Sequence, residues 1–220
     1  MHEWTLISKL DASAFATYAT KGTCENSKRS RILAGQVKKA SITNIESVAK
    51  HIINDKHGEH ILNDFLNPNV TLVPVPRSSP MKADSPSPWA SLTICEIFQQ
   101  QGLGQNILNC IKRISAVPKS QFAGRGNRPT VETHLPSLEV QRDLMIPDQI
   151  TLIDDVVTKG STTFACAIKL HEMFPDTTIR AFAVFVTRGF EEHIDSVISP
   201  CVGEIVYSNG ETSRKGEFFV

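Results

Sequence analysis

Short runs of hydrophobic, mostly β-branched residues alternate with helical segments along this chain, and that alternation constrains its fold more than any other feature. We expect buried strands at residues 70–75, 150–154 and 179–186, with a weaker strand at 205–207. The helices expected around them cover residues 43–58, 87–102, 161–174 and 190–198. Strands that are joined through helices form parallel sheets covered on both faces. The sequence therefore predicts an α/β fold with a mostly parallel central sheet.

Length and composition are those of a single globular domain. The chain has 220 residues, of which 40% are hydrophobic and 21% charged, and its formal net charge is zero. Zero net charge argues against direct binding of nucleic acid, because such binding depends largely on a basic surface. We expect one domain over residues 1–220, with a core at about 41–200 and a small hood formed by residues 1–40 and 201–220.

Cysteine spacing and hydropathy indicate the cellular compartment in which the protein resides. The five cysteines are scattered and form no Cys-x-x-Cys pair, so we expect reduced thiols rather than a disulfide framework or a zinc site. The amino-terminal residues lack the basic start and apolar run of a signal peptide. The longest clean apolar stretch, residues 181–186, is far too short to span a bilayer. The sequence therefore predicts a cytoplasmic protein without a membrane segment.

Residues 150–162 carry most of the chemical information. They read Ile-Thr-Leu-Ile-Asp-Asp-Val-Val-Thr-Lys-Gly-Ser-Thr, a hydrophobic strand that ends in Asp154 and Asp155 and then a turn that opens a helix. Free N–H groups at a helix N-terminus favour a phosphate, and Gly160 lets the backbone approach it. Carboxylates accept hydrogen bonds from sugar hydroxyls and bind divalent cations. The pattern indicates a ribose 5-phosphate site; the alternative is a structural unit whose acids only cap the helix.

This segment resembles the phosphoribosyl-pyrophosphate (PRPP) motif of type I phosphoribosyltransferases, in which a hydrophobic run precedes two acids and a Thr-x-Gly-x-Thr turn. The resemblance implies that family's fold and Mg²⁺ as a cofactor, held by Asp154 and Asp155 partly through PRPP. The turn from Thr158 to Thr162 would then hold the 5-phosphate, and the two acids the ribose hydroxyls. The PRPP-binding residues that it implies here are Asp154, Asp155, Val156, Val157, Thr158, Lys159, Gly160, Ser161 and Thr162. In the 6-oxopurine members an aspartate stands at the position of Thr158, so hypoxanthine and guanine are disfavoured as acceptors.

A second PRPP-binding segment is expected after the first core strand. Type I members bind pyrophosphate with a short loop at this place, and the resemblance assigns that role to Pro76, Arg77, Ser78 and Ser79. The guanidinium of Arg77 and the backbone N–H groups of the two serines can contact pyrophosphate oxygens. The alternative for Arg77 is an exposed surface charge.

Residues 117–136 contain three prolines and two glycines and are expected to form a long polar loop. The family has a flexible loop that closes over PRPP and brings basic groups to the leaving pyrophosphate. On that resemblance Lys119, Arg125 and Arg128 are candidate catalytic residues together with the two acids. The alternative is a solvated basic loop.

Within the family, the arrangement looks like the ComF-type (competence-protein) branch. The similar parts are Val-Pro-Val-Pro at 73–76, an intervening Arg…Asn loop and Leu-Ile-Asp-Asp-Val-Val-Thr at 152–158, whereas that branch's amino-terminal cysteine cluster is absent. Arg188, at the end of the next strand, and Tyr207 in the tail are the candidates for the acceptor side of the site. Ordinary packing is the alternative for both.

The combined prediction is a phosphoribosyltransferase that binds PRPP with Mg²⁺, transfers the 5-phosphoribosyl group to a small nitrogenous acceptor and releases pyrophosphate. The alternative is a catalytically weak or inactive PRPP- or nucleotide-sensing regulator or partner-binding protein, with a link to DNA uptake or DNA metabolism. A homodimer is the expected assembly.

Overall fold

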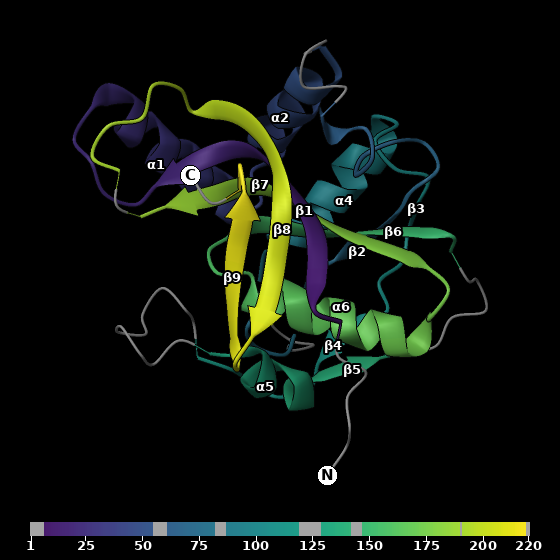
Figure 1. Ribbon diagram of the computed structural model, residues 1–220. Coiled ribbons are helices and arrows are strands. Elements are labelled where there is room, and N and C mark those ends of the chain that lie inside the picture. Colours follow the sequence, from purple (N-terminus) through teal and green to yellow (C-terminus); the bar gives the residue numbers. More distant parts are fainter. Residues whose placement is uncertain are drawn as a thin grey trace.

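A mostly parallel sheet forms the centre of the protein (Figure 1). The structure is a computed structural model, and it describes residues 7–54, 61–81, 87–118, 129–141, 147–189 and 191–218. Within these residues the sheet has seven strands, in the spatial order β3 (Asn106–Ile107), β2 (Thr71–Pro74), β6 (Gln149–Val157), β7 (Thr178–Arg188), β1 (Lys9–Ala19), β8 (Ile198–Ser208) and β9 (Glu211–Gly216). The first five run parallel, and β8 and β9 extend the sheet antiparallel.

Helices cover both faces of this sheet (Figure 1). One face carries α1 (Glu25–Lys38), α2 (Ile42–Asn54) and α4 (Ala90–Gln100), and the other carries α6 (Ser161–Met173) with the short α5 (Val131–His134). Side chains of a strand alternate between faces, so Leu152 of β6 packs in the cluster beneath α6 and Ile153 in the cluster beneath α4. The α/β fold class, with a mainly parallel sheet and helices on both faces, is confirmed.

A small second sheet lies beside α5 and α6. It pairs β4 (Ile111–Arg113) with β5 (Leu138–Val140), and a 3₁₀ turn at Leu135–Ser137 joins α5 to β5. The side chains of Val131 and Leu135 are buried in the cluster beneath α6. The latter part of the loop expected at 117–136 is therefore folded into the core, because its apolar residues pack against α6.

The expected division into a core and a terminal hood is wrong at the amino end. Strand β1 lies inside the sheet, between β7 and β8, and its central residues Ala14, Phe15 and Ala16 are buried. Sequence patterning missed it because alanine, which occupies four of its eleven positions, has low β-propensity, and neighbouring strands on both sides compensate for that. At the carboxyl end, residues expected in the hood instead form β8 and β9 of the same sheet.

The helix expected at 190–198 is also absent from the described residues 191–197. The carbonyl groups there accept hydrogen bonds from elsewhere in the chain instead of from their own segment. Asn26 donates to the carbonyls of Ile194 and Asp195, and the backbone N–H of Thr17 donates to Val197. The segment is therefore an irregular connection that is hydrogen-bonded to α1 and β1.

The five cysteines are all free thiols, as expected. Within the part of the chain that the structure describes, every helix is too short or too polar to traverse a bilayer.

Candidate functional site

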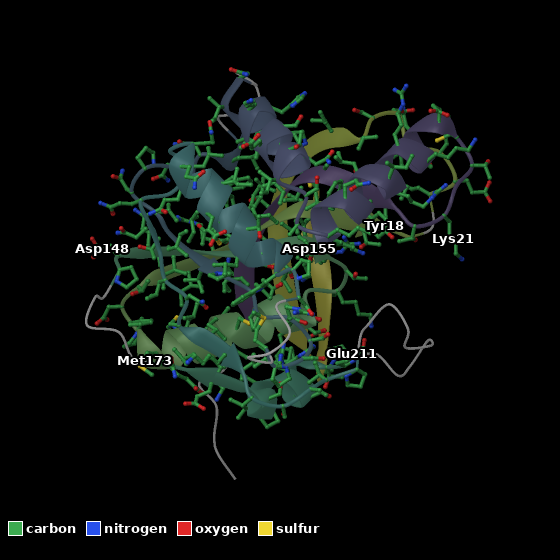
Figure 2. The ribbon with its side chains drawn as sticks, turned by 180° about the vertical axis from the view of Figure 1, so that it is seen from behind. Tyr18, Lys21, Asp148, Asp155, Met173 and Glu211 are labelled. Carbon is green, nitrogen blue, oxygen red and sulfur yellow. The ribbon has the colours of Figure 1, made fainter. Side chains whose placement is uncertain are left out.

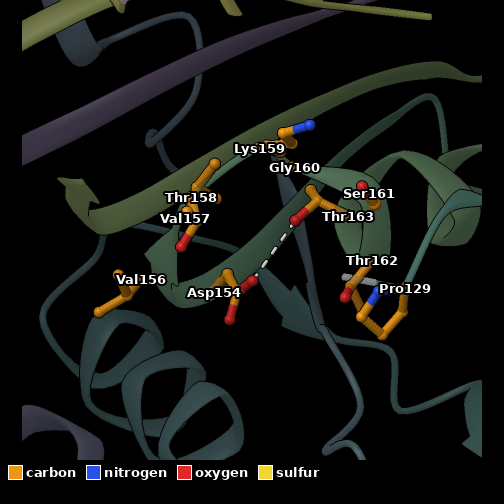
Figure 3. Close-up of a pocket in the computed structure, with 10 residues that line it drawn as sticks. All are labelled: Pro129, Asp154, Val156, Val157, Thr158, Lys159, Gly160, Ser161, Thr162 and Thr163. Carbon is orange, nitrogen blue, oxygen red and sulfur yellow. Dashed lines mark hydrogen bonds between the residues drawn. The ribbon is translucent and has the colours of Figure 1, made fainter. Parts of the chain in front are cut away.

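A cavity of about 110 Å³ opens where β6 ends and α6 begins (Figure 3). Its walls come almost entirely from the segment that sequence analysis singled out. The lining residues are Pro129, Asp154, Val156, Val157, Thr158, Lys159, Gly160, Ser161, Thr162 and Thr163. The cavity therefore lies at the carboxyl edge of the parallel strands, where open α/β sheets bind ligands.

Gly160 shapes the turn that enters α6. It is the N-cap residue and has a φ of +85°, in the left-handed region that other residues adopt only with strain. A Cβ atom at this position would lie 2.7 Å from Cδ1 of Ile205 on β8. Two features of the protein itself therefore favour glycine here: the positive φ and the close contact with the Ile205 side chain. Close approach of the backbone to a ligand is not needed to explain it.

The amino end of α6 is free to bind an anion. Its N-cap residue, Gly160, has no side chain with which to cap it, its first turn contains no acidic residue, and it borders the cavity. The first N–H groups of a helix have no partner within the helix, and they carry partial positive charge. This end of α6 can therefore hold a phosphate in the cavity through backbone N–H groups.

The hydroxyl groups of the turn are held by neighbouring elements. Oγ1 of Thr158 lies 3.3 Å from Oγ1 of Thr187 on β7, and Oγ of Ser161 lies 2.8 Å from Oγ1 of Thr212 on β9. Lys159 turns its ammonium group outward to Glu211, at 3.0 Å, so only the rest of the residue faces the cavity. These contacts connect the turn to both β7 and β9.

Asp154 and Asp155 lie near the carboxyl end of β6, in a half-buried position. Each accepts a hydrogen bond of 2.9 Å from the next backbone N–H, and Thr163 Oγ1 lies 3.4 Å from the Asp154 carboxylate (Figure 3). Burial, followed by the charge of Asp155, raises the pKa of Asp154 well above its ordinary value. Asp154 lines the cavity and Asp155 does not, although the two interact.

The structure does not support the alternative in which these acids merely cap α6, because the N-cap is Gly160. Among the described residues, neither acid forms an ion pair with a lysine or an arginine. Two adjacent carboxylates that have no basic partner repel each other when both are charged, and a bound cation would reduce that repulsion. They stand near the carboxyl end of β6, far along the strand from Asp148, which precedes its start (Figure 2).

The donor set is suitable for Mg²⁺ only with help from a ligand. Within the described parts of the chain, no group of three or more His, Cys, Asp or Glu residues could hold a metal ion. Mg²⁺ is commonly bound by one or two carboxylates together with substrate phosphates and water. Asp154 and Asp155 fit that mode, and Asp154 faces the cavity in which such a substrate would lie.

The second predicted segment, Pro76 to Ser79, comes to the same edge of the sheet, because β2 and β6 are parallel neighbours. It does not line the cavity. Arg77 directs its guanidinium group to the carbonyl of Ser87, at 3.2 Å, and to the sulfur of Met81, at 3.7 Å. The carbonyl of Ser78 accepts a 2.9 Å hydrogen bond from the N–H of Val117. The side chain of Arg77 and the backbone of Ser78 are therefore hydrogen-bonded to other parts of the protein and not directed into the cavity.

Of the remaining predicted residues, the two that the structure describes, Arg188 and Tyr207, do not line the cavity. Lys119, Arg125 and Arg128 lie outside the described residues. Arg188 ends β7 and lies 3.4 Å from Glu191. Tyr207 stacks on Phe164 of α6, with ring centroids 5.7 Å apart, and its hydroxyl donates to Glu132. The predicted acceptor-side role of Arg188 and Tyr207 stays a prediction.

Two residues that sequence reasoning did not assign to the site stand directly behind it. His134, at the end of α5, lies 3.1 Å from Thr162 Oγ1, and Arg113 of β4 contacts the other side of the imidazole. Both are buried. Local sequence gives little sign of this, because the two residues are separated by 21 positions and meet α6 only through tertiary folding. The apolar residues that flank His134 are the one available signal that this part of the loop is folded.

Comparison with known proteins gives weak likenesses to solved structures and none to curated sequences. No protein-family model and no curated protein match the sequence. Among solved structures, a hypoxanthine phosphoribosyltransferase from Staphylococcus aureus is similar over 71% of this chain and 70% of its own, with a TM-score of 0.39 and 10% sequence identity.

Proposed function

We propose that the protein is a phosphoribosyltransferase, which binds PRPP with Mg²⁺ and transfers the 5-phosphoribosyl group to a nitrogen acceptor. One observation supports this most directly: Asp154 and the uncapped amino end of α6 line the same cavity. An anion-binding helix end beside a carboxylate suits a ligand that carries a phosphate and sugar hydroxyls at a fixed separation.

In this proposal the backbone N–H groups of α6 hold the 5-phosphate, and hydroxyls of the turn add hydrogen bonds. Asp154 and Asp155 accept the ribose 2′- and 3′-hydroxyl hydrogens. When bound, Mg²⁺ neutralises negative charge on the pyrophosphate as it leaves. The two acids together orient the ribose so that its C1′ faces the acceptor.

The loop from Pro76 to Ser79 is the proposed pyrophosphate-binding segment. Its position at the end of β2, next to β6, is compatible with contact to the far end of PRPP. For this contact Arg77 would exchange its hydrogen bond to the Ser87 carbonyl for one to the ligand. Thr158, which stands where 6-oxopurine enzymes carry an aspartate, disfavours hypoxanthine and guanine as acceptors.

Calorimetry with PRPP, with and without Mg²⁺, tests the proposal. The unaltered protein should bind PRPP more tightly when Mg²⁺ is present. The double variant Asp154→Asn with Asp155→Asn should lose binding while retaining its circular dichroism spectrum. Asp148→Asn is the matched control, because Asp148 is an exposed acid at the opposite end of β6 and should leave binding unchanged (Figure 2). Absence of Mg²⁺-dependent PRPP binding to the unaltered protein would refute the proposal.

Catalysis is tested separately by pyrophosphate release over a panel of nitrogenous bases and amines. Release with one acceptor, abolished in the double variant, supports transfer. PRPP binding without release over the whole panel favours the second candidate, a PRPP- or nucleotide-sensing regulator of the ComF type.

A further inference from the structure

A buried chain of hydrogen bonds reaches the candidate phosphate site from the side of α6 that faces α5. Arg113 and His134 are 6% and 2% exposed. Nη1 of Arg113 lies 3.4 Å from Nδ1 of His134, and Nε2 of His134 lies 3.1 Å from Oγ1 of Thr162. Thr162 lines the cavity (Figure 3). This series of hydrogen bonds therefore runs from a charged group in the interior to a hydroxyl group at the site.

The hydrogen-bonding capacities of these groups fix the direction of the chain. A guanidinium group has only donors, so Nδ1 of His134 must be the acceptor from Arg113. A neutral imidazole that accepts at Nδ1 carries its hydrogen on Nε2, which then donates to Thr162 Oγ1. The hydroxyl hydrogen of Thr162 remains, and within the described residues no acceptor is recorded for it.

Arg113 also contacts the other predicted ligand-binding segment. Its Nε donates a 3.0 Å hydrogen bond to the carbonyl of Arg77, and Nη1 donates to Oγ of Ser137. One guanidinium group thus supports the loop after β2 and, through His134, the first turn of α6. These are the two segments to which the proposed function assigns the two ends of PRPP.

We propose that Arg113 and His134 are positioning residues, which hold the Thr162 hydroxyl so that it donates its hydrogen to a phosphate bound at the amino end of α6. The inference rests on the proposed function, since it assigns the donor for the 5-phosphate in that site. Arg113 does not line the cavity, and its proposed role is to keep His134 in the required tautomer.

The tautomer can be measured without any ligand. Nitrogen-15 NMR of the imidazole ring of His134 at pH 7 should show a neutral ring with hydrogen on Nε2. Arg113→Lys should alter the chemical shift of Nδ1, because a lysine ammonium group cannot reproduce the several hydrogen bonds that the guanidinium group donates. A ring with hydrogen on Nδ1, or a charged ring at pH 7, would overturn the proposal.

A double-mutant cycle tests the effect on binding, with ribose 5-phosphate as the probe. His134→Leu and Thr162→Val should each weaken binding about three- to tenfold, the effect of one lost hydrogen bond. In the Thr162→Val background His134→Leu should have no further effect, because the hydroxyl that it positions is gone. His134→Gln, whose amide N–H can take the place of Nε2, should retain most of the affinity.

His193→Leu is the matched control, because this histidine is 73% exposed and belongs to an outer connection. Circular dichroism at the assay temperature verifies that each variant is folded. Equal effects of His134→Leu in both backgrounds would show a merely structural role and refute the positioning. If the unaltered protein binds neither ribose 5-phosphate nor PRPP, the proposed function is refuted and the positioning role with it.

Discussion

The buried imidazole of His134 should make folding stability depend on pH. Burial, followed by the charge of Arg113, lowers its pKa from 6.5 to about 4. The unfolded chain therefore binds a proton at this residue between about pH 6.5 and pH 4, and the folded chain does not. The stabilising contribution is complete above pH 6.5 and is lost as the pH falls toward 4. At about 1.4 kcal/mol per pH unit, the full loss is about 3 kcal/mol, of which about 2 kcal/mol is lost by pH 5.

Urea denaturation of the unaltered protein and of His134→Gln, at pH 7.5 and at pH 5, measures this contribution. Other titrating groups affect both proteins alike, so only the difference between their free energies of unfolding matters. Relative to His134→Gln, we expect the free energy of unfolding of the unaltered protein to fall by about 2 kcal/mol between pH 7.5 and pH 5. A difference that stays constant to within about 0.5 kcal/mol would mean that the folded state protonates His134 as readily as the unfolded chain does, and would refute the assigned burial effect.

Two further predictions concern the turn and the acids. Gly160→Ala should destabilise the protein by about 1–3 kcal/mol, because its φ is positive and the added Cβ would press on Ile205. Gly35→Ala, in the last turn of α1 with open space around it, should instead stabilise the protein by about 0.5–1 kcal/mol in the same urea assay. Equal effects at the two glycines would contradict this account. Asp154→Asn should gain thermal stability over the unaltered protein as the pH rises, because a raised pKa means that ionisation of Asp154 destabilises the folded state. Melting curves at pH 4 and pH 9 measure it, because the loss begins near the ordinary pKa of an aspartate, and an advantage of the variant that does not grow between these pH values would exclude it.

The strand-turn-helix unit at the site could be predicted from local sequence. The hydrophobic run, the two acids and the turn with Gly160 predict that α6 begins at Ser161, where the structure has it, whereas β6 continues to Val157, three residues beyond its expected end at Asp154. Short-range physics decides this region, because an exposed helix end and a positive φ both leave a signature within a few residues.

Long-range contacts explain what was missed. The alanine-rich β1 becomes a strand only because β7 and β8 flank it, and the contact of His134 with Thr162 joins residues 28 positions apart. A single sequence contains no local pattern that reports either contact. The division into core and hood was wrong for the same reason.

The position of β1 has a consequence for how the chain acquires its structure during synthesis. Its sheet partners, around residues 181–188 and 198–206, are made long after it, so the strand must wait unpaired until those residues have left the ribosome. Such distant pairings slow folding and leave apolar surface open to aggregation in the meantime. We therefore expect fragments that end before residue 180 to remain insoluble or chaperone-bound, even though they contain all of residues 150–162.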